Sequence, residues 1–343
     1  MTDLPAAPRS AEEAFAGRRR HLGQRIQHLV HRHPWASPLS ILVVAVAVFS
    51  VLSPQFGTPG NLSLVVQQSA VVAAVAAAQA LVLISGGIDL SVGALMVLTT
   101  LVAARLSAEA GIPGPLALLL GGLLGATLGA VNGTLAAVFR LNPFVVTLGT
   151  WSVFAALVTL VSGGVGIDGG SMDPFLTWTG ASIVIGGFTI TVGMVVVAVL
   201  YALLGYALLM TAWGRHVFAV GDDAEASRLV AIRITRVRFG VYVVVGVILT
   251  VAGWVLMGRT GGASPQTGLS VNLDSITAAV IGGTSLAGGR GSIMGAVIGS
   301  VLVTVFRNGL FLAGVDVLYQ NLAVGVLTIV AVGLDQWIKK VRT

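Results

Sequence analysis

The sequence predicts an all-α integral membrane protein with about ten transmembrane helices, arranged in two parallel, related halves. Of its 343 residues, 56% are hydrophobic and 9% are charged, against roughly 45–50% and about 25% in soluble domains. The apolar residues gather in segments near the length of about 17–25 residues that crosses a bilayer as a helix. A glycine motif near residue 86 recurs near residue 282, as expected of a membrane protein built from an internal repeat.

Ten apolar segments account for the predicted helices. The eighth is short, and the first follows a basic leader, as the core of a signal peptide would. That leader exceeds 30 residues and no small-residue cleavage site follows Leu52, so we expect an uncleaved helix. The predicted helices cover residues 38–54, 62–84, 88–107, 115–139, 142–162, 187–212, 237–259, 272–286, 291–312 and 317–338.

Basic residues predict the orientation of these helices. With the N-terminus inside, the cytoplasmic segments carry sixteen arginines and lysines, and the outer side carries only Arg105 and Arg259. This asymmetry places both termini in the cytoplasm. The net charge of +6 is therefore a topology signal and not a nucleic-acid footprint. Residues 1–34 are predicted to be a basic tail against anionic lipid, and residues 35–343 the transmembrane domain.

The glycine motif reads Ser-Gly-Gly-Ile-Asp-Leu-Ser-Val-Gly over 85–93 and Ile-Gly-Gly-Thr-Ser-Leu-Ala-Gly-Gly over 281–289. In this alignment Gly86 and Gly87 match Gly282 and Gly283. Both preceding helices run inward in the predicted topology, so the halves are parallel. Helix breaks at these glycines must lie against protein or water, because lipid cannot satisfy the freed backbone groups. Asp89 or Ser91, and Ser285 in the second copy, are candidates to cap the restarted helices; a direct role in a transport pathway is the alternative.

The segment 212–238 is the longest polar stretch between predicted spans, on the cytoplasmic side. Asp222 followed by Glu225 has the form of a capping box, and Ala226, Leu229, Val230 and Ile232 line up as an apolar stripe. Such a short amphipathic helix has nothing of its own to pack against. It is expected to lie in a groove of a partner protein; the alternative is a helix lying at the lipid surface.

Several kinds of chemistry are excluded by residue types. The chain has no cysteine, and all five histidines fall outside the apolar segments, so an intramembrane thiol, a histidine metal site and a histidine proton relay are not expected. The two lysines, Lys339 and Lys340, lie near the C-terminus, where they cannot serve a phosphate-binding loop. Neither a metal nor a cofactor is predicted. A membrane-embedded enzyme and an ion-coupled transporter therefore find little support.

Polar residues in or near the spans are candidates to line a transport pathway, although polar residues in helix bundles commonly hydrogen-bond to other helices. Arg307 stands out because a buried arginine is costly in hydrocarbon. It should face an aqueous cavity or pair with an acid such as Asp316 or Asp274. The principal candidates are Asp89, Asn132, Asn142, Trp151, Asn272, Asp274, Arg307 and Asn308, with Gln67, Gln68, Gln79, Thr147 and Asn321 beside them.

Four motifs carry a resemblance to a known family. The two glycine motifs, Pro-Phe-Val-Val-Thr-Leu-Gly-Thr at 143–150 and Gly-Arg-His-Val-Phe-Ala-Val-Gly at 214–221 together closely resemble the permease subunits of bacterial ribose, xylose and related monosaccharide ABC importers. The resemblance runs from about residue 38 to the end. Trp-Gly-Arg-His at 213–216 and Phe-Arg-Asn-Gly at 306–309 look more like the fructose branch. Many ribose-type relatives have Asn-Asn-Gly where this chain has Arg307-Asn308-Gly309, which argues against ribose recognition carried over unchanged.

The resemblance implies the ABC importer permease fold in the bacterial inner membrane. It implies a second permease copy in a homodimer, an extracytoplasmic sugar-binding protein, and a cytoplasmic ATPase with two fused nucleotide-binding domains that hydrolyses ATP on a separate subunit. Import of a nucleoside or a sugar-like quorum signal is the alternative within the family. The segment from residue 214 matches the family's ATPase-coupling helix, with the residues Gly214, Arg215, Gly221, Asp222, Glu225, Ala226, Leu229 and Val230.

Overall fold

The computed structural model describes residues 36–268 and 271–340, and the predicted basic tail over residues 1–34 lies outside this range. The described residues form ten apolar helices: seven are long and apolar enough to cross a membrane, and in the other three the apolar stretch is shorter. This confirms the predicted all-α membrane fold. The helices are α3 (Ala36–Leu52), α4 (Pro59–Ile84), α5 (Val92–Ala110), α6 (Gly114–Gly133), α7 (Pro143–Ser162), α8 (Val192–Met210), α11 (Ile234–Thr260), α12 (Val271–Ile281), α13 (Ile293–Leu312) and α14 (Val317–Lys340).

Side-chain caps and prolines set where several of these helices begin. Thr58 accepts a hydrogen bond from the N–H of Asn61 before α4, and Asn142 accepts one from Phe144 before α7. In both helices a proline occupies the first turn, where its missing N–H costs nothing. Ser292 caps α13 in the same way. The helix starts are therefore encoded locally, as the capping preferences of Ser, Thr and Asn lead one to expect.

Helix α4 forms the centre of the bundle. It packs against α8, α11, α12 and α13, and its alanine-rich stretch from Ala73 to Ala80 is fully or almost fully buried. Small residues also bring α6 and α11 together, because a side chain on Gly125 or on Gly246 would overlap the backbone of the other glycine. Close backbone approach of this kind is how helices associate in a membrane, where lipid is as apolar as leucine.

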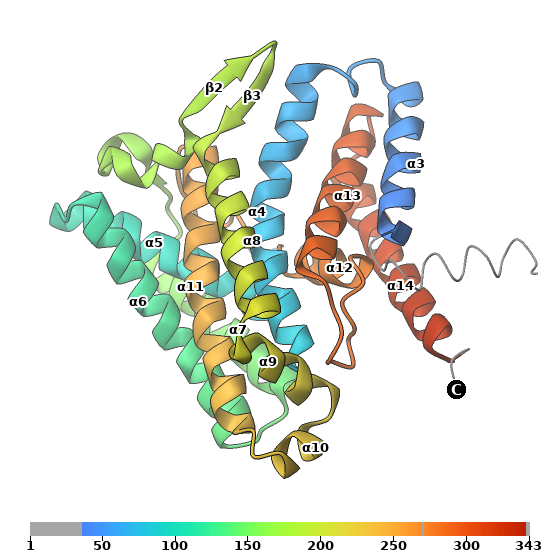
Figure 1. Ribbon diagram of the computed structural model, residues 1–343. Coiled ribbons are helices and arrows are strands. Elements are labelled where there is room, and N and C mark those ends of the chain that lie inside the picture. The colour runs from blue at the N-terminus through green and yellow to red at the C-terminus, as the bar shows by residue number, and fades with distance from the viewer. Residues whose placement is uncertain (1–35, 269–270, 341–343) are drawn as a thin grey trace, which may run out of the picture.

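The connection between α7 and α8 forms a folded cap at one end of the bundle, which we call the hairpin end (Figure 1). Strand β1 (Ile167–Asp168) pairs with β4 (Gly262–Ala263), and β2 (Ser182–Ile185) pairs with β3 (Phe188–Thr191). Three short 3₁₀ turns, η2 (Gly169–Ser171), η3 (Pro174–Leu176) and η4 (Trp178–Gly180), lie between β1 and β2.

The predicted start of the sixth helix at residue 187 is wrong. Residues Phe188–Thr191 form β3, and α8 begins at Val192 after the cap Thr191. The two residues of the hairpin turn, Gly186 and Gly187, have φ values of 58° and 81°. Positive φ at both positions of a two-residue turn matches the twist of the flanking strands, so the glycine pair makes a hairpin here and not a helix.

Two short helices, α9 (Ala212–Asp222) and α10 (Ala224–Leu229), lie at the opposite end of the bundle, which we call the α9 end (Figure 1). They connect α8 to α11. The predicted capping box at Asp222 is wrong. Asp222 ends α9, and Asp223 caps α10 by accepting from the N–H of Ala226 at 3.0 Å. The carboxylate of Glu225 instead pairs with Arg228 at 2.7 Å.

Candidate functional site

Both copies of the glycine motif end a helix in the same way. After α4, the N–H of Gly86 bonds to the carbonyl of Leu83 and the N–H of Gly87 to that of Val82. After α12, the N–H groups of Gly283 and Thr284 bond to Val280 and Ala279 in the same pattern. Gly86 and Gly283 have φ values of 83° and 88°, which places each at the left-handed position of a Schellman cap.

The predicted alignment of the two copies is therefore wrong by one residue. Gly86 corresponds in structure to Gly283 and not to Gly282. The second loop is also longer, because α13 begins only at Ile293 after the cap Ser292. Gly282 serves a different purpose, since a side chain there would overlap the backbone of Gly295 in α13. The four predicted break glycines thus divide between helix termination and close helix packing.

The last turn of α9 meets both glycine loops. The N–H of Gly289 donates to the carbonyl of Ile84 at 2.9 Å. A side chain on Gly221 would overlap that carbonyl and would lie 2.7 Å from the nitrogen of Gly289. A side chain on Gly288 would lie 2.9 Å from the Cα of Gly86. We call Gly86, Gly221, Gly288 and Gly289 the glycine junction. It joins α9 to the loops that follow α4 and α12. Both helices therefore end at the same end of the bundle, so the two repeat copies are parallel.

Some of the residues predicted to contact the ATPase are buried, and others are exposed. In α9, Gly214, Val217 and Val220 are buried, and a side chain on Gly214 would overlap the backbone of Leu208. Arg215, Asp222, Glu225 and Ala226 are exposed. At the end of α10, Leu229 is 86% exposed, and the next residue, Val230, is 71% exposed. An apolar edge is therefore presented by helices that are themselves fixed to the bundle.

A buried polar cluster lies behind the first glycine loop. Asp89 accepts hydrogen bonds from the backbone N–H and the hydroxyl of Ser91 at 2.7 and 2.6 Å. The side-chain amide of Asn132 in α6 donates to the same hydroxyl at 2.9 Å. Asp89 Oδ2, Asn132 Oδ1 and the hydroxyl of Tyr242 are buried without a hydrogen-bond partner among the described residues. Two predicted pathway residues, Asp89 and Asn132, thus share one cluster that has unused acceptor capacity.

The cap of α5 comes from the other half of the chain. Asn272 in α12 accepts from the N–H of Gly93 at 2.5 Å and donates to the carbonyl of Leu90 at 2.8 Å. The predicted caps are wrong here, because Asp89 bonds to Ser91 and Ser91 makes no side-chain cap. Ser285 likewise accepts from Ala287 within its own loop and does not cap α13. Asn272 therefore ties the second repeat copy to the first.

Arg307 lies between α12, α13 and α14. Its guanidinium pairs with Asp274 at 2.7 Å and donates to the side chain of Asn321 at 2.9 Å. The Asp274 side chain is 8% exposed and that of Arg307 is 28% exposed. Asp316, the other acid considered, instead accepts from the N–H of Leu318 at 2.8 Å. The cationic residue of α13 is thus held by α12 and α14.

The remaining predicted pathway residues lie apart from one another. Asn308 in α13 exchanges hydrogen bonds with Asn61 at the start of α4, at 3.0 and 2.9 Å. Asn142 caps α7, and Trp151, also in α7, is 39% exposed. The structure therefore does not bring the eight predicted residues into one site.

Sequence reasoning did not single out Asn61, Tyr242 or Gly288. Asn61 resembles an ordinary residue of a first helical turn, and Tyr242 lies within a long apolar helix. Each acquires its importance from a neighbour more than one hundred residues away, such as Asn308 for Asn61. Only Gly288 had a local signal, because the pair Gly288-Gly289 ends the second glycine motif.

Packed apolar helices, glycine loops between them and an exposed apolar edge on helices outside the bundle together define a membrane-spanning transport subunit. The chain belongs to the family described as branched-chain amino acid transport system / permease component, whose model matches residues 61–332. This agrees with the resemblance to import permeases. No solved structure matches the chain.

Individual relatives align along nearly the whole chain. The fructose import permease protein of Rhizobium meliloti is 44% identical over 332 residues, covering 96% of this chain and 92% of the relative. The ribose import permease protein of Bacillus subtilis is 35% identical over 299 residues, covering 87% and 92%. The D-allose transport system permease protein of Escherichia coli is 34% identical over 302 residues, covering 88% and 91%.

Proposed function

We propose that this chain forms the translocation pathway of an ATP-driven importer in the bacterial inner membrane, and that its substrate is a monosaccharide, with fructose as the first candidate. The observation that carries the proposal is the 44% identity to a fructose import permease over 96% of this chain. Ribose and D-allose permeases are also similar at 35% and 34% identity, so the substrate class has firmer support than the individual sugar.

The test is uptake into proteoliposomes that hold the permease with its ATPase and a sugar-binding protein. We expect ATP-dependent accumulation of labelled fructose that exceeds that of ribose, and no accumulation of a nucleoside. Accumulation of ribose alone would keep the substrate class and change the sugar. Accumulation of the nucleoside without any monosaccharide would overturn the proposed substrate class.

The α9 end supports docking of the ATPase. Leu229 and Val230 present an exposed apolar edge, which water disfavours and a groove on a partner would cover. Leu229→Asp should weaken association with the ATPase and reduce uptake, while the permease keeps its thermal unfolding temperature because the side chain makes no buried contact. Ile183→Asp is the matched control, since Ile183 is 69% exposed in β2, at the hairpin end. Equal behaviour of the two variants would exclude this docking surface.

The glycine junction supports a route from that docking surface to both halves. Helix α9 contacts the α4 loop through Gly221 and Ile84, and the α12 loop through Gly221, Gly288 and Gly289. Backbone groups in direct contact have no flexible side chain between them to absorb a displacement. Movement of α9 driven by an ATPase would therefore move the ends of both repeat copies together.

The charge distribution supports the proposed orientation, with both termini in the cytoplasm. Among the described residues, Arg140, Arg228, Arg233, Arg236 and Arg238 line the α9 end, as the positive-inside rule expects of a cytoplasmic end. A reporter that folds only in the cytoplasm, fused after Thr343, should be active; an inactive reporter would reverse the topology.

We further propose that two copies of the chain and an ATPase with two fused nucleotide-binding domains make up the complex. The pathway would then lie between the copies. Native mass spectrometry of the purified complex should give two permeases per assembly. A single copy would contradict the homodimer.

A further inference from the structure

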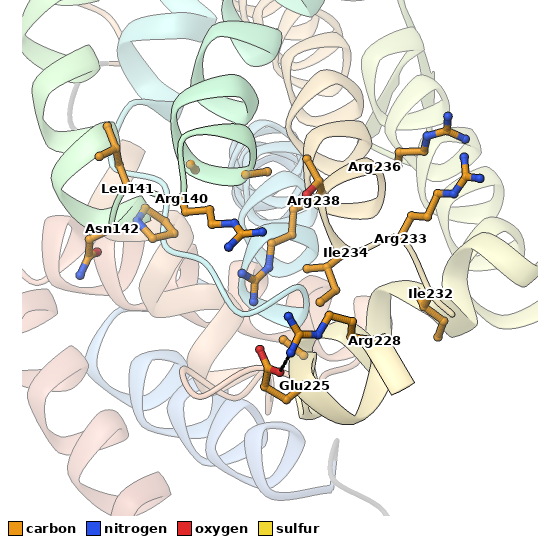
Figure 2. Close-up of a pocket in the computed structure, with 15 residues that line it drawn as sticks. Arg140, Leu141, Asn142, Glu225, Arg228, Ile232, Arg233, Ile234, Arg236 and Arg238 are labelled. Atoms are coloured by element: carbon orange, nitrogen blue, oxygen red, sulfur yellow. Dashed lines mark ion pairs between the residues drawn. The ribbon is translucent and has the colours of Figure 1, made fainter. Parts of the chain in front are cut away.

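An arginine-lined pocket opens at the α9 end beside α10. Its volume is about 770 Å³, and five arginines line it together with a single acid, Glu225. Figure 2 shows Arg140, Arg228 and Arg238 reaching toward one another from three different segments. The side chains that carry formal charge in the wall are Arg140, Arg228, Arg233, Arg236, Arg238 and Glu225.

The positive charge of this pocket is poorly balanced by the protein. Glu225 pairs with Arg228 at 2.7 Å, and Arg238 donates to the carbonyl of Ser85 at 3.4 Å. Arg140, Arg233 and Arg236 make no ion pair or side-chain hydrogen bond within residues 36–268 and 271–340. Like charges that converge in a concave wall repel one another unless an anion lies between them.

Two helix starts add to this positive potential. Helix α7 begins at Pro143 and α11 at Ile234, and both residues line the pocket. Neither helix has an acidic residue in its first turn, and α11 has no side-chain cap. The first N–H groups of a helix carry partial positive charge and lack partners within the helix. The pocket thus combines guanidinium groups with the positive ends of two helix dipoles, and both favour a bound anion.

We propose that this pocket binds a phosphate-bearing anion, supplied either by the headgroup of an anionic phospholipid or by a soluble phosphate ester. Guanidinium groups are planar forks that bind phosphate oxygens in pairs. The volume of about 770 Å³ is within the range of small-ligand sites and leaves room for the group that the phosphate is attached to. Arginines that served only to fix the membrane topology would not need to point toward one another from three different segments.

Direct binding to the full-length permease tests the proposal. Inorganic phosphate is titrated by calorimetry into permease held in nanodiscs of phosphatidylcholine, with chloride at the same ionic strength as the reference. Phosphatidylglycerol retained by the permease in detergent is measured by native mass spectrometry against phosphatidylcholine. In Arg140→Gln/Arg228→Gln we expect binding at least about tenfold weaker, since each charge-assisted hydrogen bond is worth more than the 1.4 kcal/mol of a tenfold change.

The control is Arg105→Gln, which removes an arginine paired with Glu109 at 2.7 Å in α5, away from the pocket, and should leave binding unchanged. If the double variant unfolds at a lower temperature, Arg140→Gln provides the same test at a single exposed position, with a smaller loss of affinity. If the double variant loses binding of phosphatidylglycerol alone, the ligand is a phospholipid headgroup. If it loses binding of inorganic phosphate alone, the ligand is a soluble phosphate ester.

Two results would overturn the proposal. In the first, neither probe binds to the unmodified permease; if the double variant then also loses association with the ATPase, the pocket receives an acidic segment of that protein instead. In the second, a probe binds and its binding survives the double variant. The proposal is independent of the sugar that the permease carries.

Discussion

Gly221→Ala is the most direct test of the glycine junction. The added methyl group would overlap the carbonyl oxygen of Ile84 and would lie 2.7 Å from the nitrogen of Gly289. Both are backbone atoms, so neither can move aside by a change of rotamer. The substitution must therefore separate α9 from the two loops, or separate the loops from each other and break the 2.9 Å hydrogen bond between Gly289 and Ile84.

The opposing energies can be compared. Overpacking costs typically about 1–3 kcal/mol, and the loss of one hydrogen bond about 0.5–1.5 kcal/mol. Alanine favours a helix over glycine by about 1 kcal/mol, which offsets part of this cost because Gly221 lies in α9. We expect a net destabilisation of about 1–3 kcal/mol. Gly205→Ala in α8 is the matched control, since nothing lies within 4 Å of its added methyl group.

The assay follows tryptophan fluorescence during thermal unfolding, because the chain has six tryptophans and no cysteine for a thiol dye. Gly221→Ala should unfold at a lower temperature than Gly205→Ala. In proteoliposomes, the Gly221→Ala permease should also lose uptake while ATP hydrolysis continues. A variant that was only less stable would still transport in the fraction that remains folded. Unfolding and uptake equal to those of Gly205→Ala would refute the reasoning.

Three further predictions concern polar contacts. Asn272→Ala removes the bonds to Gly93 and Leu90 and should destabilise the permease by about 1–3 kcal/mol, seen as a lower unfolding temperature; no change would show that water replaces both bonds. Arg307→Gln leaves Asp274 without its cation and should lower the unfolding temperature, with partial recovery in Arg307→Gln/Asp274→Asn; altered uptake at an unchanged unfolding temperature would instead support a pathway role. The N–H groups of Gly114 and Phe175 hold the pKa of Asp173 below its usual value, so its stabilising effect is present above the pKa of about 3.9 of the unfolded chain and is lost as the pH falls through the lower folded pKa. Asp173→Asn should therefore unfold earlier than the unmodified chain at pH 7, and the gap should close in strong acid; a gap independent of pH would contradict this.

Local sequence signals were sufficient for most of the fold. Hydrophobic length located all ten apolar helices, because crossing a bilayer imposes a length that composition alone reveals. Caps such as Asn142 and Ser292 then fixed individual starts. The hairpin of β2 and β3 was missed because Ile183, Val184 and Ile185 are apolar and merge with the following helix in any hydropathy profile. Only the glycine pair at 186–187 signalled the turn.

Positions that depend on tertiary packing could not be read from the sequence. The two glycine pairs align in the sequence by composition, but the residue that needs positive φ follows Ser85 in one copy and Gly282 in the other. The helix end therefore decides the correspondence. Asn272 gave no sign that it caps α5, because its partners lie about 180 residues earlier. Long-range contacts of this kind decide which polar residues meet. This is why the predicted pathway residues separate into several small groups.

These contacts connect the two halves of the chain to each other and to α9. The first glycine loop leads directly into α5, and the second leads into α13. Asn272 connects the start of α5 with α12, and Arg307 connects α13 with α12. A displacement of α9 at the glycine junction would therefore reach α5 and α13 through separate loops but would be constrained by the shared helix α12. Because packed backbone contacts do not compress, a displacement of α9 that moved one glycine loop would move the other loop as well.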